Sequence, residues 1–137
     1  MRHRIKTHSF NRDTKNRKAL LKNLLLSLFE HGEIEVTKAR AKEVKRWADK
    51  LLPLAQENTL ASKRKLHEFF GKRDVVNSLC EVIAPAFDDR KSGFTTLEIV
   101  GTRKGDNALM ARLSLAIKPA DLNGFSRKEV KNEENKS

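Results

Sequence analysis

The first eighteen residues, MRHRIKTHSFNRDTKNRK, most constrain what this chain can fold into. Seven of them are Lys or Arg and one is Asp, while only Ile5 and Phe10 are appreciably apolar. Such a segment buries too little apolar surface to offset the entropy that it loses on ordering. It cannot fold alone, and we expect it to become ordered against a partner.

The net charge indicates the kind of partner. The 137 residues carry a formal charge of +11. Residues 1–22 hold eight Lys or Arg and one Asp, whereas the other 115 residues hold 21 basic and 17 acidic residues. A charge balance this basic favours a polyanionic partner, such as a nucleic acid, an acidic protein or an anionic membrane. We expect the N-terminus to meet this partner, with help from local clusters further along the chain.

Three features bear on where the chain works. Cys80 is the only cysteine, which excludes a disulfide framework and a cysteine-type zinc site and fits a reducing cytoplasm. No apolar run reaches transmembrane length, because Lys22 and Asn23 interrupt LLKNLLLSLF. The basic start leads into an amphipathic helix without a small-residue cleavage site, so we expect no secretory signal. A cytoplasmic protein without a membrane partner is predicted.

Hydrophobic periodicity predicts four helices. The first has Leu at three- and four-residue spacing and is followed by Gly32. We expect Thr37 and Asp74 to cap the second and fourth helices, and Pro53 to kink the second helix or end it early. Leu60 is expected to face inward from the third. The four helices are predicted over residues 14–31, 38–57, 60–70 and 75–84.

Alternating apolar and polar residues predict a small sheet. Residues 33–36, 95–100 and 109–118 alternate, and each of the last two strands is expected to bury one face. The loop GTRKGDN joins these two strands in a hairpin and displays Arg103 and Lys104. The predicted fold class is therefore α+β: one domain in the order α-β-α-α-α-β-β, with the sheet packed by helices. Its parts are a basic arm (1–13), a globular domain (14–118) and a disordered tail (119–137).

Two basic clusters allow alternative interpretations. Lys15, Arg17 and Lys18 lie in the first turn of a helix, where the macrodipole disfavours cations. A phosphate bound at this N-terminus would remove the conflict, but the charges can also be simply solvated. The face with Lys38, Lys42 and Lys45 is either a binding face or a solvated helix surface. Glu43 and Asp49 interrupt this face.

No catalytic constellation is recognisable. His67-Glu68 starts like HExxH, but no second His follows, and GTRKGD lacks the GK[ST] ending of a P-loop. His3 and His8 lie in the arm, where contacts to phosphate or base are expected in place of metal ligation. We therefore expect a protein that is not an enzyme and has no metal, no cofactor and no small-molecule substrate.

Three stretches resemble the bacterial large-subunit ribosomal protein L17 family. They are MRHR, NRKALLKNLLLSLFEHGEIEVTKARAKEVKRWADKLLPLA and EVIAPAFDDRKSGFTTLEIVGTRKGDNALM, and the resemblance covers about residues 1–117. It implies an α-β-α₃-β₂ fold and a structural constituent that clamps large-subunit (23S) ribosomal RNA near the polypeptide exit tunnel and supports assembly and translation. Phe94 stands where the family usually has Tyr, and Thr102 where Pro is common.

The resemblance and the charge pattern together give the expected contacts. The implied partners are large-subunit ribosomal RNA and neighbouring large-subunit ribosomal proteins. Charge alone fits a free-standing nucleic-acid-binding protein of nucleoid or regulatory type equally well, but no recognition helix or dimer symmetry is visible. The expected RNA-binding residues are Arg2, His3, Arg4, Lys6, His8, Arg12, Lys15, Arg17, Lys18, Lys22, Lys38, Lys42, Lys45, Arg103 and Lys104.

Overall fold

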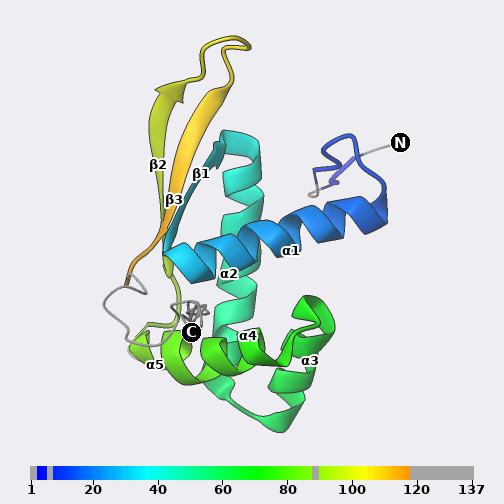
Figure 1. Cartoon of the computed structure of the whole chain (residues 1–137), viewed down its shortest axis with the longest axis vertical. Coiled ribbons are helices and arrows are strands. Elements are labelled where there is room, and N and C mark those ends of the chain that lie inside the picture. Colours follow the sequence, from blue (N-terminus) through cyan, green and yellow to red (C-terminus); the bar gives the residue numbers. More distant parts are fainter. Residues whose placement is uncertain (1–2, 6–7, 88–89, 118–137) are drawn as a thin grey trace, which may run out of the picture.

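The element order follows the predicted sequence of helices and strands (Figure 1). The computed structural model describes residues 3–5, 8–87 and 90–117. The order confirms the α-β-α-α-α-β-β prediction, with the fourth helix divided into three short segments. The elements are α1 (Thr14–His31), β1 (Glu33–Thr37), α2 (Lys38–Glu57), α3 (Leu60–Phe70), α4 (Arg73–Ser78), the π-helical segment η1 (Leu79–Ile83), α5 (Ala84–Ala86), β2 (Thr95–Thr102) and β3 (Leu109–Leu115).

The three strands form one antiparallel sheet in the order β1-β3-β2. Leu113 in the central strand pairs with Ile34 on one side and with Leu97 on the other. The predicted hairpin of β2 and β3 is confirmed. Its register shifts between Ile99 and Gly101, so β2 carries a bulge there. A bulge bends and twists a strand locally, and in Figure 1 the hairpin extends past the helices.

Helix α2 contacts all three strands and also packs against α1, α3 and α5. The core between these elements is rich in phenylalanine. Phe70 of α3 meets Phe29 of α1 edge to face, with 6.2 Å between the ring centroids. Phe87, after α5, meets Phe94, before β2, in the same way at 5.5 Å. All four rings are fully buried or nearly so, and edge-to-face pairs are a favoured aromatic geometry.

Local sequence explains most helix ends. Gly32 follows α1 with φ of 80°, and its N–H donates to the Leu28 carbonyl at 2.8 Å, as expected of a left-handed C-terminal cap. A capping box between Thr59 and Ser62 starts α3. Thr37 occupies the N-cap of α2, as predicted, but its side chain makes no capping hydrogen bond. The predicted Asp74 cap is wrong: Lys72 is the N-cap of α4, and Asp74 lies in the first turn.

Four further predictions need correction. Helix α2 reaches Glu57, the end of its predicted range, so of the two effects expected of Pro53 the early end is wrong; buried Leu52 and Ala55 hold the last turns in the core. Leu60 does not face inward, since it begins α3 outside the core and is 66% exposed. Ile99 shares the alternating face of Thr95 and Leu97 that is expected to be buried, yet it is 54% exposed because β2 runs beyond the helices there. Strand β3 ends at Leu115 and not near residue 118. The predicted tail (119–137) lies outside the described residues.

Candidate nucleic-acid interface

The described part of the arm presents its polar side chains to solvent. Residues 3–5 and 8–13 form turns without helix or strand, and the Arg12 N–H donates to the Ser9 carbonyl at 3.0 Å. Phe10 is half-buried, with its ring centroid 5.7 Å from that of His8. The predicted contact residues His3, Arg4, His8 and Arg12 are exposed. Arg2 and Lys6 lie outside the described residues.

The N-terminus of α1 is capped by an acidic side chain. Asp13 Oδ1 accepts a hydrogen bond from the Asn16 N–H at 3.2 Å. The carboxylate places negative charge beside Lys15 and Arg17, where the macrodipole of the helix is positive. The charge conflict that suggested a phosphate here is therefore relieved within the chain. No cap was predicted at this position, although Asp is a preferred N-cap residue.

The start of α2 lies against the arm and the hairpin. A cavity of about 400 Å³ opens between them, which we call the arm–hairpin cavity. Unlike α1, α2 has no side-chain cap, and its first turn contains no acidic residue. Its first N–H groups and its lysines therefore make this end positive. The cavity brings together three predicted contact residues from two parts of the sequence: His8 of the arm, and Lys38 and Lys42 of α2. The cavity is lined by His8, Thr37, Lys38, Ala39, Lys42, Ala108 and Leu109.

The basic face of α2 is less interrupted than its sequence indicates. Glu43 is 5% exposed, and its carboxylate accepts a hydrogen bond from the guanidinium of Arg46 within the helix. It therefore adds little negative charge to the surface. Asp49 is half-buried, and its burial raises the pKa of its carboxyl, against an opposing effect of Lys45. Lys42 is exposed and Lys45 is half-buried.

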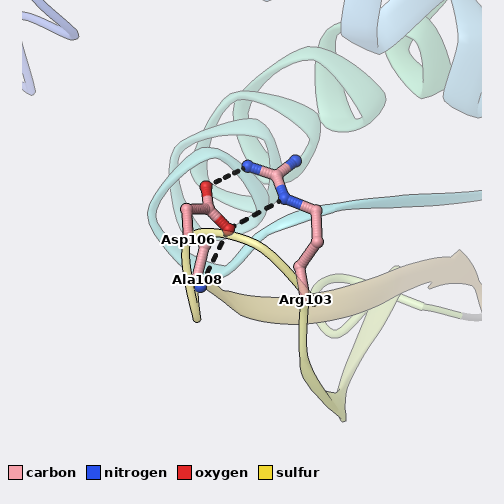
Figure 2. A network of polar contacts seen from close by, with 3 residues as sticks. All are labelled: Arg103, Asp106 and Ala108. Carbon is pink, nitrogen blue, oxygen red and sulfur yellow. Dashed lines mark hydrogen bonds and ion pairs between the residues drawn. The ribbon is translucent and has the colours of Figure 1, made fainter.

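The hairpin loop carries one constrained cation and one unpaired cation. Arg103 donates two hydrogen bonds to the carboxylate of Asp106, which also accepts from the Ala108 N–H (Figure 2). The interaction with Arg103 lowers the pKa of Asp106 to about 2. Arg103 keeps about half of its side chain exposed. Lys104 is exposed and has no hydrogen-bond or ion-pair partner in the described part of the chain.

A second hollow lies between α1, α2 and α3, and we call it the three-helix pocket. Its volume is about 410 Å³. It brings Lys18 and Lys22, which were predicted contacts, together with Lys65 and Trp47, which were not. By helical spacing alone, Trp47 falls on the apolar side of α2 and Lys65 on an outward face of α3. The lining residues are Lys18, Ala19, Leu21, Lys22, Trp47, Leu51, Lys65, Glu68 and Phe69.

Neither a membrane-spanning helix nor a cluster of metal-ligating side chains occurs in the described ranges 3–5, 8–87 and 90–117. None of the helices there is both long enough and apolar enough to cross a membrane. No group of three or more His, Cys, Asp or Glu residues in these ranges is arranged to hold a metal ion. Cys80 is buried in the core, and its burial raises the pKa of the thiol.

The chain is similar to known proteins over most of its length. A family model described as Ribosomal protein L17 matches residues 20–116. A relative from Dictyoglomus thermophilum is 43% identical over 115 residues, which are 84% of this chain and 99% of that protein. One from Natranaerobius thermophilus is 46% identical over 104 residues, 76% of this chain and 92% of that protein. One from Gemmatimonas aurantiaca is 40% identical over 117 residues, which are 85% of this chain and 99% of that protein.

These three relatives carry the same name, large ribosomal subunit protein bL17. They are ribosomal proteins and not enzymes, in agreement with the expectation that this chain has no catalytic function. The family match spans α1 from Leu20 through β3, so it includes the sheet and the helices that pack on it. The chain therefore belongs to the ribosomal protein L17 family.

Proposed function

We propose that the chain is a structural constituent of the large ribosomal subunit, where it binds large-subunit ribosomal RNA near the polypeptide exit tunnel. The observation that carries this proposal is the family match, together with relatives named as large-subunit proteins that align over almost their whole length. The positive charge of residues 1–22 supports RNA as the direct partner. Neighbouring large-subunit proteins are the further partners, in the cytoplasm of a bacterium.

Three surfaces contribute in different ways. The arm (1–13) has few apolar side chains, so it enters RNA crevices that a globular surface cannot enter, and it orders as it binds. The arm–hairpin cavity places Lys38 and Lys42 beside the arm, where they neutralise phosphates. The hairpin loop reaches RNA with Arg103 and Lys104. We assign no role to residues 119–137.

Affinity and specificity come from different contacts. Lys and Arg displace condensed counterions from the RNA, and each phosphate contact contributes about 0.7–0.9 to the slope of log affinity against log salt. Recognition of the correct site depends on the shape of the folded RNA and on its 2′-hydroxyl groups. The globular domain (14–118) then holds RNA segments together as a wedge between them. The proposed contacts are those named from the sequence.

The test is sedimentation of a cell lysate through a sucrose gradient in high salt, with this chain followed across the fractions. We expect it to travel with the large ribosomal subunit in a one-to-one ratio. A chain that stays at the top of the gradient, or that follows DNA after ribonuclease treatment, would instead be a free-standing nucleic-acid-binding protein. A variant without residues 2–12 serves as the control for binding through the arm.

A further inference from the structure

We propose that the three-helix pocket receives one unstacked nucleotide of the bound RNA. This inference rests on the proposed function and adds a specific recognition site to it. The base would enter between α1, α2 and α3, and its phosphates would lie at the lysine rim. The pocket volume of about 410 Å³ lies within the range of about 300–1,000 Å³ that small-ligand sites occupy.

The pocket wall is suited to a base. Trp47 and Phe69 both line it and stack on each other, with ring centroids 5.3 Å apart and planes inclined by 27°. Ala19, Leu21 and Leu51 complete an apolar lining. Bases that leave a helical stack are commonly held by aromatic side chains, because each base has an apolar face. The Trp47 Nε1–H, which is buried, has no hydrogen-bond partner in the described part of the chain.

The charges at the pocket favour an anionic ligand. The pocket lining contains three lysines, Lys18, Lys22 and Lys65, and a single carboxylate, that of Glu68. Lys22 lies close to the C-terminal end of α3, since a Cβ atom added at Gly71 would be 3.5 Å from its Nζ. The partial negative charge of that helix end holds the ammonium group at the rim. Three cations around an apolar wall match a nucleotide, which joins a flat base to charged phosphates.

Glu68 limits where the phosphates can lie. Its carboxylate repels a phosphate on its own side of the pocket, so the phosphates are directed toward the α1 lysines. The same oxygens can accept a hydrogen bond from a ribose hydroxyl or a base amino group. An acidic peptide segment would satisfy the lysines but would leave the aromatic wall without a flat partner. The combination therefore favours RNA over an acidic protein.

The experiment uses the full chain and two RNA hairpins of the same sequence. One hairpin carries a single unpaired adenosine in its stem, and the other carries an abasic residue at that position, so both have the same number of phosphates. We expect the adenosine hairpin to bind about tenfold more tightly, because stacking of one base on an aromatic side chain strengthens binding by about that factor or more. We also expect it alone to change the fluorescence of Trp47, the only tryptophan in a chain without tyrosine.

Three variants locate the effect. Ala19→Phe fills the pocket from an exposed position of α1 and is expected to make the two hairpins bind equally. Asn23→Phe adds the same ring at an exposed position of α1 that does not line the pocket, and it should preserve the tenfold difference. Lys18→Ala should weaken both hairpins by the same factor, because it removes a phosphate contact on α1 and leaves the wall intact.

The outcomes separate this inference from the proposed function. Equal affinities in the unchanged protein, or a tenfold difference that survives Ala19→Phe, would overturn the nucleotide pocket and leave RNA binding standing. A deca-glutamate peptide that changes Trp47 fluorescence in the unchanged protein but not in Ala19→Phe would show that the pocket takes an acidic protein segment. Failure of either hairpin to bind at low salt would count against RNA binding itself.

Discussion

Arg103 and Asp106 form a two-point ion pair across the hairpin loop. Arg103 Nη2 lies 2.6 Å from Asp106 Oδ2, and its Nε lies 3.2 Å from Oδ1. The pair lowers the pKa of Asp106 from its ordinary value of 3.8 to about 2. Because the folded-state pKa is lowered, the stabilisation is present above about pH 4 and is lost as the pH falls through 2.

We expect the Asp106 carboxyl to titrate near pH 2 when its resonance is followed by NMR. In Arg103→Gln the midpoint should move upward toward 3.8, since the charged hydrogen-bond donor is gone. Arg112→Gln is the control, because Arg112 lies on β3 and forms an ion pair with Glu35 on β1. A midpoint near 4 in the unchanged protein would mean that the pair does not persist in solution.

Two leucines of α3 should differ sharply in their effect on stability. Leu66 is fully buried, whereas Leu60 is 66% exposed. Leu66→Ala should lower the free energy of unfolding by about 2–5 kcal/mol, because it removes buried methyl groups and leaves a cavity. Leu60→Ala should change it by about 0.5 kcal/mol or less. Urea denaturation monitored through Trp47 measures both, and similar losses would contradict the placement of α3.

Two variants of Asp13 separate the effect of its negative charge from the effect of its capping hydrogen bond. Asp13→Ala should destabilise the protein by about 1 kcal/mol, because the Asn16 N–H loses its acceptor. Asp13→Asn retains a good cap and removes a negative charge beside Lys15 and Arg17. We therefore expect it to be destabilised less than Asp13→Ala, since it loses only the charge, and to bind an RNA hairpin more tightly. Weaker binding by Asp13→Asn would argue against RNA at this end of α1.

The arm should be dispensable for folding and required for binding. Deletion of residues 2–12 keeps the Asp13 cap and removes side chains that, apart from half-buried Phe10, are exposed where the structure describes them. The thermal midpoint of the truncated chain should match that of the full chain, while its incorporation into large subunits should fail. Gradient sedimentation of a tagged copy measures incorporation, and normal incorporation would remove the arm from the proposed mechanism.

We expect the two lysines of the arm–hairpin cavity, Lys38 and Lys42, to bind RNA through its phosphates. The double variant Lys38→Ala, Lys42→Ala is expected to lower the slope of log RNA affinity against log salt by about 1.5. Each phosphate contact contributes about 0.7–0.9 to that slope, and two are lost. The loss should be similar for hairpins of different sequence, since phosphates carry no base identity. Lys91→Ala, an exposed lysine outside both hollows, is the matched control. An unchanged slope in the double variant would exclude these two contacts.

Periodic patterns predicted most of the fold because helices and strands are local structures. The bounds of α1, α2 and α3 match the predicted helices, and β1 and the β2–β3 hairpin are where alternation placed them. The pattern could not show how far an element runs beyond the core. Leu60 and Ile99 fit their patterns, yet they lie where α3 begins and where β2 leaves the helices. Burial there depends on tertiary placement.

The functional surfaces depended even more on placement. Nothing in the sequence indicates that Lys65 of α3 lines the same pocket as Lys18 of α1, or that His8 lines the same cavity as Lys38, because these residues come together only in the folded chain. Glu43 was expected to interrupt a basic face, and its burial follows from the turn of α2 toward the core. The Asp13 cap, in contrast, was readable from residue type alone. Long-range pairings were missed because they have no local signature.

The central position of β3 sets an order on how the chain can acquire its sheet during synthesis. Among the described strands, β1 and β2 each bond only to β3, which is synthesised after both of them. A nascent chain that has not reached Leu109 has two strands with no hydrogen-bonding neighbour between them. Each newly made copy can therefore complete this sheet only after residues 109–115 have been synthesised, and a copy that terminates before them leaves the edges of β1 and β2 unpaired.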